Sequence, residues 1–189
     1  MSGSGPLSER EKALEDLFFR KESERLLEAM RDRKTREEHF AALSSVLGVD
    51  SPELINPLLD LELRAENAAV LVLAPFISVA WADHQLDNEE RHSILKAEDD
   101  FGIDRKSEAG QLLELWLDHR PHESLLDAWA AYVGELCRVL EPDVRTKLRD
   151  DVVSRSRRIA RAVEKSLLRG GGPTDAENAV LERIEAAFL

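Results

Sequence analysis

The sequence predicts an all-α fold, a compact helical bundle built around one central apolar helix. First, residues 68–82 carry no charge, and Ser78 is their only polar side chain, as expected of a helix buried on every side. Second, apolar residues recur at helical spacing in the flanking segments. Third, the 189 residues include only nine glycines and seven prolines, which favours helices over short strands and turns.

The composition indicates a soluble globular protein, with 43% hydrophobic and 34% charged residues. The length suffices for one well-buried domain with an appendage. A single cysteine, Cys137, excludes an internal disulfide framework and fits a reducing compartment. The N-terminus lacks the apolar core of a signal peptide, so the sequence predicts a cytoplasmic protein.

The N-terminal third is predicted to be a disordered lead-in, residues 1–7, followed by a helical hairpin, residues 8–47. Ser8 and Glu11 have capping-box spacing and start the first helix. Thr35, with Glu38 three residues on, is expected to start the second, which ends near Gly48. We expect this hairpin to pack on the main body, residues 48–189, and the alternative is that it packs on a partner.

The central segment, residues 67–91, is predicted to be a helix, an acidic turn and a second helix. The apolar run is too short for a bilayer, which needs about 20 apolar residues. It is also too long and too rich in alanine for one buried strand, and Pro75 is expected to kink the helix. The pattern stops after Ala82, and Asp87 with Glu90 forms a helix start. We call residues 83–91 the acidic elbow.

The remaining helices are delimited by caps and breaks. Ser51 or Asp50 caps a short helix with Pro52 in its first turn, and Gly102 ends the helix after the elbow. The later helices are expected over residues 107–119, 123–140, 141–168 and 174–188, with a break at 170–173. Thr174 and Glu177 repeat the capping-box spacing, which predicts two pseudo-equivalent helix-turn-helix units around the central helix.

The net charge of −12 is concentrated in the middle of the chain. Residues 48–130 hold six basic against eighteen acidic side chains, whereas the segments on either side are nearly balanced. Phosphates would be repelled there, so we expect no nucleic-acid partner. A cation or a basic protein surface would suit the region, and a solvated acidic face is the alternative.

Ala-Trp-Ala-Asp at residues 80–83, Leu86, Asp87 and Glu90 resemble the signature of TerB-like proteins, the tellurite-resistance protein B family. Residues 116–137 and 170–188 are also similar to that family, and the resemblance covers about residue 63 to the C-terminus. It implies a helical bundle in the bacterial cytoplasm, a stress-response or tellurite-resistance role and no known catalytic chemistry. It also implies a divalent cation held by Asp83, Asp87 and Glu90. His84 stands where the family usually has glycine.

The three carboxylates Asp83, Asp87 and Glu90 are therefore the candidate metal ligands, since Mg²⁺, Ca²⁺ and Mn²⁺ prefer oxygen. Their spacing does not match an EF-hand, because Ile94 and Asn88 occupy its twelfth and sixth positions. The alternative is that Asp87 and Glu90 only cap a helix. Four arginines, Arg155, Arg157, Arg158 and Arg161, form a basic stripe that we expect to pair with the acidic middle third, within the chain or across a homodimer.

The sequence thus predicts a non-enzymatic interaction module that presents the acidic elbow to a protein partner. No cofactor is required, although a divalent cation is compatible with the elbow, and no membrane insertion is expected. The alternative from another class is a metal-dependent hydrolase that uses the carboxylates of Asp83, Asp87 and Glu90.

Overall fold

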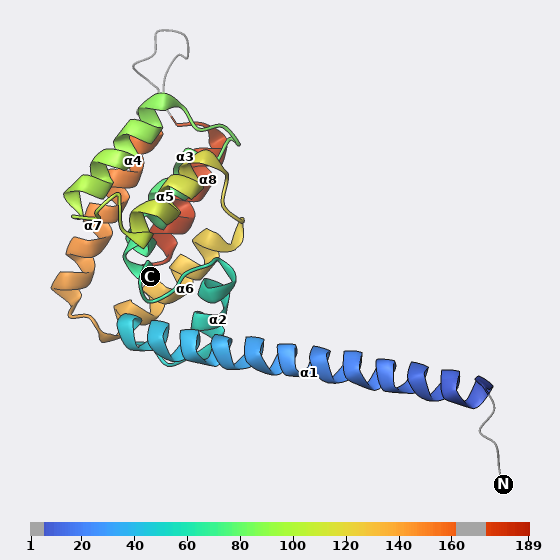
Figure 1. The fold of residues 1–189 in the computed structure, drawn as a ribbon. Helices are drawn as coiled ribbons and strands as arrows, with labels where there is room; N and C mark the ends of the chain where they lie inside the picture. Colours follow the sequence, from blue (N-terminus) through green and yellow to red (C-terminus); the bar gives the residue numbers. More distant parts are fainter. Residues whose placement is uncertain (1–5, 162–172) are drawn as a thin grey trace. The chain divides into compact units, whose positions relative to one another are not determined.

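The described residues, 6–161 and 173–189 of a computed structural model, form helices and contain no strand, which confirms the all-α prediction (Figure 1). The elements are α1 (Pro6–Leu47), α2 (Pro52–Asp60), the 3₁₀ helix η1 (Ala68–Leu73), α3 (Ala74–Ala80), α4 (Asn88–Asp100), α5 (Glu108–Asp118), α6 (Ser124–Val139), α7 (Pro142–Ala160) and α8 (Asp175–Ala186). None of these helices is both long and apolar enough to cross a membrane.

The chain divides into two units, residues 1–41 and 42–189. The first unit is the greater part of α1. The last turn of α1 belongs to the second unit, where Leu43 is fully buried. The second unit therefore begins six residues before the boundary expected at residue 48.

The predicted N-terminal hairpin is wrong, because α1 continues through the expected turn without a break. Thr35 has no glycine or proline near it to end the first helix, so its capping-box spacing with Glu38 lies in a helix interior. Ion pairs of i,i+4 spacing, Arg33 to Glu37 and Lys34 to Glu38, span this point and favour continuous helix. Of the lead-in predicted over residues 1–7, residues 1–5 lie outside the described residues, and Pro6 starts α1.

The central element of the second unit is α3, which packs against η1, α4, α6, α7 and α8. Phe76, Ile77 and Val79 are fully buried, as the uncharged sequence predicts. The central α-helix is shorter than expected, because its first half is the 3₁₀ helix η1. Pro75 explains the change: it lacks a backbone N–H and is tolerated in the first turn of a helix, so α3 begins at Ala74.

The helix starts follow the predicted caps. The Ser107 hydroxyl accepts a hydrogen bond from the Gly110 N–H at 3.2 Å and starts α5, while Ser51 precedes α2 with Pro52 in its first turn. Gly102 adopts a φ of +69° directly after α4, as its predicted role in ending that helix requires. The last turns predicted for α7 and the glycine break at 170–172 lie outside the described residues.

The tryptophans contribute packing and a hydrogen bond to this core. Trp116 and Trp129 are buried, and the Trp129 ring meets Phe188 edge to face with centroids 5.9 Å apart. The half-buried Trp81 donates its indole N–H to the Trp116 carbonyl at 2.9 Å. Cys137 is free and buried among apolar residues, and burial raises the pKa of its thiol, as suits a small core side chain.

Candidate functional site

The acidic elbow connects α3 to α4 and faces outward. His84, Gln85, Asn88 and Glu89 are exposed, and the sequence between Asp83 and Asp87 is turn or coil. The elbow is fixed at its base by Trp81, whose indole is bonded to α5. It is therefore a protruding turn between two rigid helices.

His84 has the left-handed backbone that glycine favours, with φ +68°. A non-glycine residue pays about 1–2 kcal/mol for this conformation. Two contacts offset that cost: the His84 N–H donates to the Trp81 carbonyl at 3.1 Å, and the ring Nδ1 contacts the Arg120 guanidinium. The histidine thus holds a left-handed turn that glycine would adopt without strain.

Asp87 and Glu90 form the predicted capping box at the start of α4. The Glu90 Oε2 accepts from the Asp87 N–H at 3.0 Å. The same arrangement starts α8, where the Glu177 Oε2 accepts from the Thr174 N–H at 2.6 Å and the Thr174 hydroxyl accepts from the Glu177 N–H at 3.2 Å. Both glutamates are buried, although carboxylates are seldom buried without a cationic partner.

Glu90 has an unusual charge state because of this environment. Burial raises its pKa to about 8, and the negative charges of Glu177, Asp87 and Asp83 add to the shift, while the hydrogen bond from the Asp87 N–H opposes it. Four carboxylates from the elbow and the start of α8, those of Asp83, Asp87, Glu90 and Glu177, therefore share one electrostatic neighbourhood, and the buried Glu90 holds a proton at neutral pH.

We predict that this proton makes the free energy of unfolding depend on pH. The folded state keeps it up to about pH 8, whereas the unfolded state releases it near pH 4.5. The unfolded state binds fewer protons between these values, so stability falls as pH rises through the window. Glu90→Gln keeps an acceptor for the Asp87 N–H and removes the titration. Between pH 5 and pH 8 it should gain at least about 1.4 kcal/mol relative to wild type.

Urea unfolding at pH 5, 6.5 and 8 measures this difference. Glu182→Gln, which neutralises an exposed carboxylate on α8, is the control and should follow the wild-type profile. Parallel pH profiles for wild type and Glu90→Gln would contradict the assigned protonation.

The structure places the three predicted metal ligands near one another but gives each a local role. Asp83 is half-buried and accepts from the Gln85 N–H at 3.1 Å, Asp87 caps α4, and Glu90 is buried behind Asp87. Within residues 6–161 and 173–189, no three or more His, Cys, Asp or Glu side chains are placed to hold a metal ion. Glu177, near the C-terminus, lies close enough to Glu90 to influence its pKa. In the sequence, the capping-box spacing between Thr174 and Glu177 is the pattern that points to this residue.

Among the described residues, two arginines of the basic stripe, Arg155 and Arg157, have ion-pair partners. Arg155 bonds to Asp151 and to Asp100 of the acidic middle third, and its guanidinium lies 5.0 Å from the centre of the Phe101 ring. Arg157 pairs with Glu185 of α8. The pair between Arg155 and Asp100 is a contact with the acidic middle third within the chain, as predicted, whereas Asp151 and Glu185 lie outside that segment.

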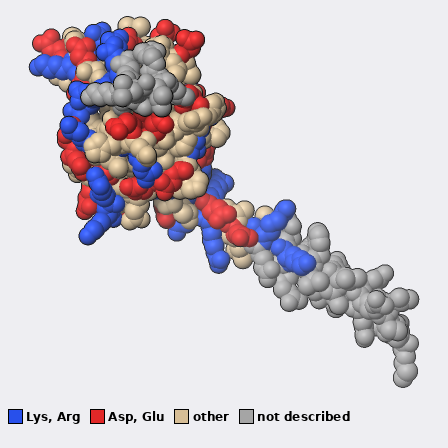
Figure 2. Space-filling model, turned by 90° about the horizontal axis from the view of Figure 1, so that it is seen from above, with Lys and Arg blue, Asp and Glu red and all other residues tan. Residues whose placement is uncertain are grey.

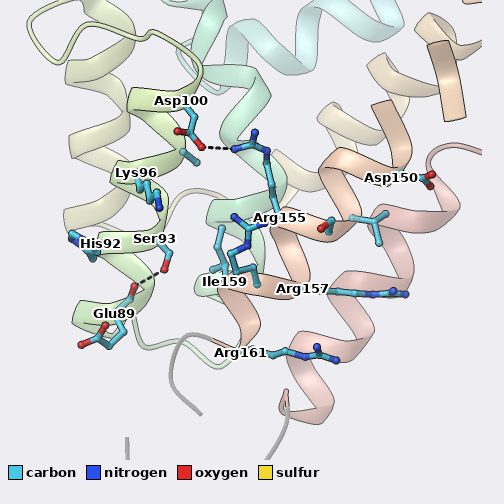
Figure 3. Close-up of a pocket in the computed structure, with 14 residues that line it drawn as sticks. Glu89, His92, Ser93, Lys96, Asp100, Asp150, Arg155, Arg157, Ile159 and Arg161 are labelled. Atoms are coloured by element: carbon cyan, nitrogen blue, oxygen red, sulfur yellow. Dashed lines mark hydrogen bonds and ion pairs between the residues drawn. The ribbon is translucent and has the colours of Figure 1, made fainter. Parts of the chain in front are cut away.

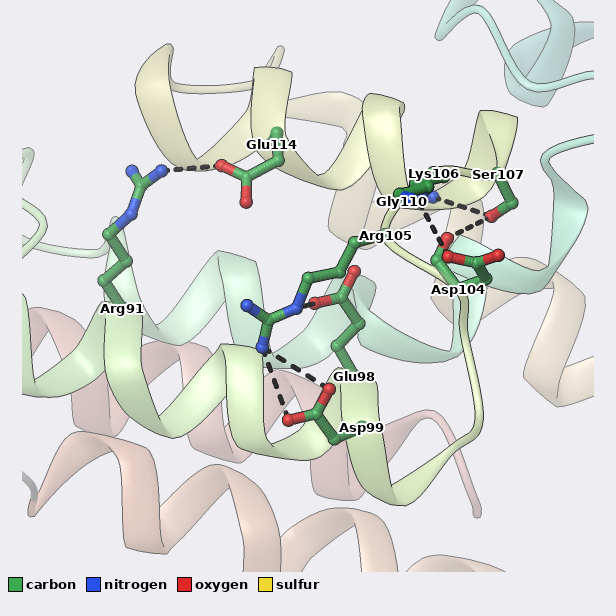
Figure 4. Close-up of polar contacts among 9 residues, drawn as sticks. All are labelled: Arg91, Glu98, Asp99, Asp104, Arg105, Lys106, Ser107, Gly110 and Glu114. Atoms are coloured by element: carbon green, nitrogen blue, oxygen red, sulfur yellow. Dashed lines mark hydrogen bonds and ion pairs between the residues drawn. The ribbon is translucent and has the colours of Figure 1, made fainter.

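One buried carboxylate was not identified from the sequence. Glu98 on α4 is fully buried, and the Arg105 Nε lies 3.3 Å from its Oε2 (Figure 4). Burial raises its pKa, and Arg105 opposes the shift. Gly110 lets the loop that carries Arg105 pack tightly on α5, since a Cβ there would lie 2.5 Å from the Arg105 Cα. The sequence signal was the i,i+4 spacing from Ile94, which puts Glu98 on the apolar face of α4.

Comparisons with protein-family models, with curated proteins and with solved structures found no match to this chain. The resemblance to TerB-like proteins therefore stays a prediction from the residues of the elbow and of the C-terminal repeat.

Proposed function

We propose that this chain is a non-enzymatic interaction module whose second unit presents the acidic elbow to a basic surface of a partner protein. The observation that carries the proposal is the combination at the elbow of exposed side chains and a hydrogen-bonded turn. Exposed polar side chains at residues 84, 85, 88 and 89 project from a turn that is held by Trp81 on one side and by the Asp87 capping box on the other.

Rigidity favours binding because little conformational entropy is lost when the partner arrives. The left-handed His84, bonded through its N–H to Trp81, fixes the direction of the turn. The capping box fixes the first turn of α4, where Glu89 is exposed. A partner would meet a preformed turn rather than a loop that must order.

The charge near the elbow favours a basic partner. Within the elbow Glu89 is exposed and Asp83 and Asp87 are half-buried, and on α5 Asp118 and Glu114 pair with its last residue, Arg91, at 2.9 and 2.7 Å. On one face of the molecule, acidic side chains lie in separate groups between basic ones (Figure 2). Recognition is therefore local, through contacts at the elbow, rather than through a broad field of one sign.

The hydrolase alternative gains no support from the geometry. Its three carboxylates are committed to a turn and a capping box, and Glu90 is buried where a substrate does not reach it. The family role that the resemblance implies, stress response or tellurite resistance, is compatible with an interaction module and is part of the same proposal.

The proposal predicts that charge reversal at the elbow abolishes partner binding without unfolding the protein. The test variant is Asp83→Lys with Gln85→Lys, which leaves the capping residues and Glu89 in place. The matched control is Glu182→Lys with Gln111→Lys, which makes the same change in net charge at exposed positions on α8 and α5. Crosslinking affinity capture from the native host, with quantitative mass spectrometry, compares the three proteins.

A partner that wild type and control retain, and that the elbow variant loses at least about tenfold, supports the proposal. Matched thermal melting of the three proteins ensures that the loss is not unfolding. Equal capture by the elbow variant and the control would contradict it.

A further inference from the structure

A groove with a volume of about 890 Å³ lies between α4 and α7, next to the elbow, whose exposed Glu89 is among its lining residues. Its floor includes the buried Ala97 and Ile159, and its walls carry charged side chains from both helices (Figure 3). This volume is in the range of small-molecule sites, about 300–1,000 Å³. The groove is therefore large enough for a ligand of modest size.

Cations outnumber anions along this groove, although the chain as a whole is acidic. Five of the lining residues are Lys or Arg, namely Lys96, Arg155, Arg157, Arg158 and Arg161, and three are acidic, Glu89, Asp100 and Asp150. Asp100 is already paired with Arg155, and Asp150 with Arg149. An excess of positive charge therefore remains in the groove.

Some of the cations in the groove already pair with carboxylates, and others do not. Arg155 reaches across to Asp100, and Arg157 leaves α7 on the side away from α4, where it pairs with Glu185 (Figure 3). Lys96 on α4 and Arg158 on α7 are exposed and have no ion-pair partner within the part of the chain that the structure describes. Arg161, directly after α7, is likewise exposed and has no ion-pair partner among the described residues. Uncommitted cations therefore line both walls, and Ser154 lies one helical turn before Arg158 in the same lining, an arrangement that can hold an anion from both sides.

We propose that this groove binds a small soluble anion that carries two or more phosphate groups, with Lys96 and Arg158 as its principal contacts. Arg158 supplies the planar fork of N–H donors that matches phosphate oxygens, and Lys96 supplies a point charge. Ser154 adds a neutral donor. No Phe, Tyr or Trp lies among the described lining residues, and His92 carries the one ring among them, so the contacts that the groove offers are mainly to phosphates.

The charge of the whole chain selects against larger polyanions. At −12, the protein repels nucleic acid and anionic membranes at distances where their many charges add up. A small anion inside the groove feels mainly the nearby cations, because charges more than about 8 Å away are largely screened at physiological salt. The same phosphate chemistry on a lipid headgroup is therefore disfavoured relative to a free ligand.

Isothermal titration calorimetry with sodium tripolyphosphate at physiological ionic strength tests the proposal. We expect one site on wild type and binding roughly tenfold weaker in each of Lys96→Gln and Arg158→Gln, because hydrogen bonds to charged groups are among the strong ones. Lys147→Gln is the control, since it removes an exposed charge from α7 outside the groove. It should bind as wild type does.

Three results would overturn the proposal: no binding to wild type, equal weakening in Lys147→Gln, or binding only to vesicles that contain phosphatidic acid. The inference goes beyond the proposed function and is separable from it. The Asp83→Lys, Gln85→Lys variant alters neither Lys96 nor Arg158 and should retain tripolyphosphate binding even though it loses the protein partner.

Discussion

Phe76→Ala should lower the free energy of unfolding of the second unit by about 3–5 kcal/mol, the usual cost of deleting a buried ring. Phe76 is fully buried at the centre of α3 and stacks on Phe101 with ring centroids 6.3 Å apart. Phe101 in turn lies under the Arg155 guanidinium of α7. The substitution therefore leaves a cavity where α3, the end of α4 and α7 meet.

Urea unfolding followed by tryptophan fluorescence measures this loss. Val139→Ala is the control: Val139 is 77% exposed on α6, and its truncation should change stability by less than about 0.5 kcal/mol. Equal effects of the two substitutions would mean that α3 is not the core of the second unit.

Arg105→Ala should destabilise the protein by about 2–4 kcal/mol at pH 8, because it leaves the fully buried Glu98 carboxylate without its ion-pair partner. The loss should be smaller at pH 5. The pKa of Glu98 is already raised by burial, and a protonated Glu98 needs no cation. Thermal and urea unfolding at the two pH values measure both effects.

A double substitution tests whether the buried charge causes this loss. Glu98→Met with Arg105→Ala removes the charge and its partner together, so it should recover most of the stability lost in Arg105→Ala alone. If the double variant is as unstable as the single one, Arg105 stabilises the loop by packing, and the interpretation of Glu98 as a buried ion is wrong.

Features that depend on residues close in sequence were predictable. Asp87 with Glu90, Thr174 with Glu177 and the Ser107 cap each act within three residues of a helix start, so the chain alone specifies them. The uncharged segment around Phe76 is likewise expected to be buried in the core, because it has no polar face to present to water.

The predictions that were wrong concern segments in which two local sequence rules compete, or features that depend on tertiary packing. Thr35 and Glu38 have the spacing of a capping box, which would start a new helix. No helix breaker lies nearby, so the i,i+4 ion pairs around them stabilise an unbroken α1. Pro75 was expected to kink a helix and instead starts one.

The candidate site was predictable only in part, for the same reason. The outward position of His84 and the cap at Asp87 follow from local sequence. The coupling of Glu90 to Glu177 joins segments far apart in the chain, and so does the groove that α4 and α7 form. Such contacts depend on how the helices pack, which helical periodicity does not specify.

Hydrogen–deuterium exchange of the second unit, with and without its captured partner, tests the central claim most directly. We expect partner binding to slow amide exchange in residues 83–91, which include the first turn of α4, and to leave exchange in α6 unchanged. Protection confined to α6 or α7, with the elbow exchanging as in the free protein, would contradict it.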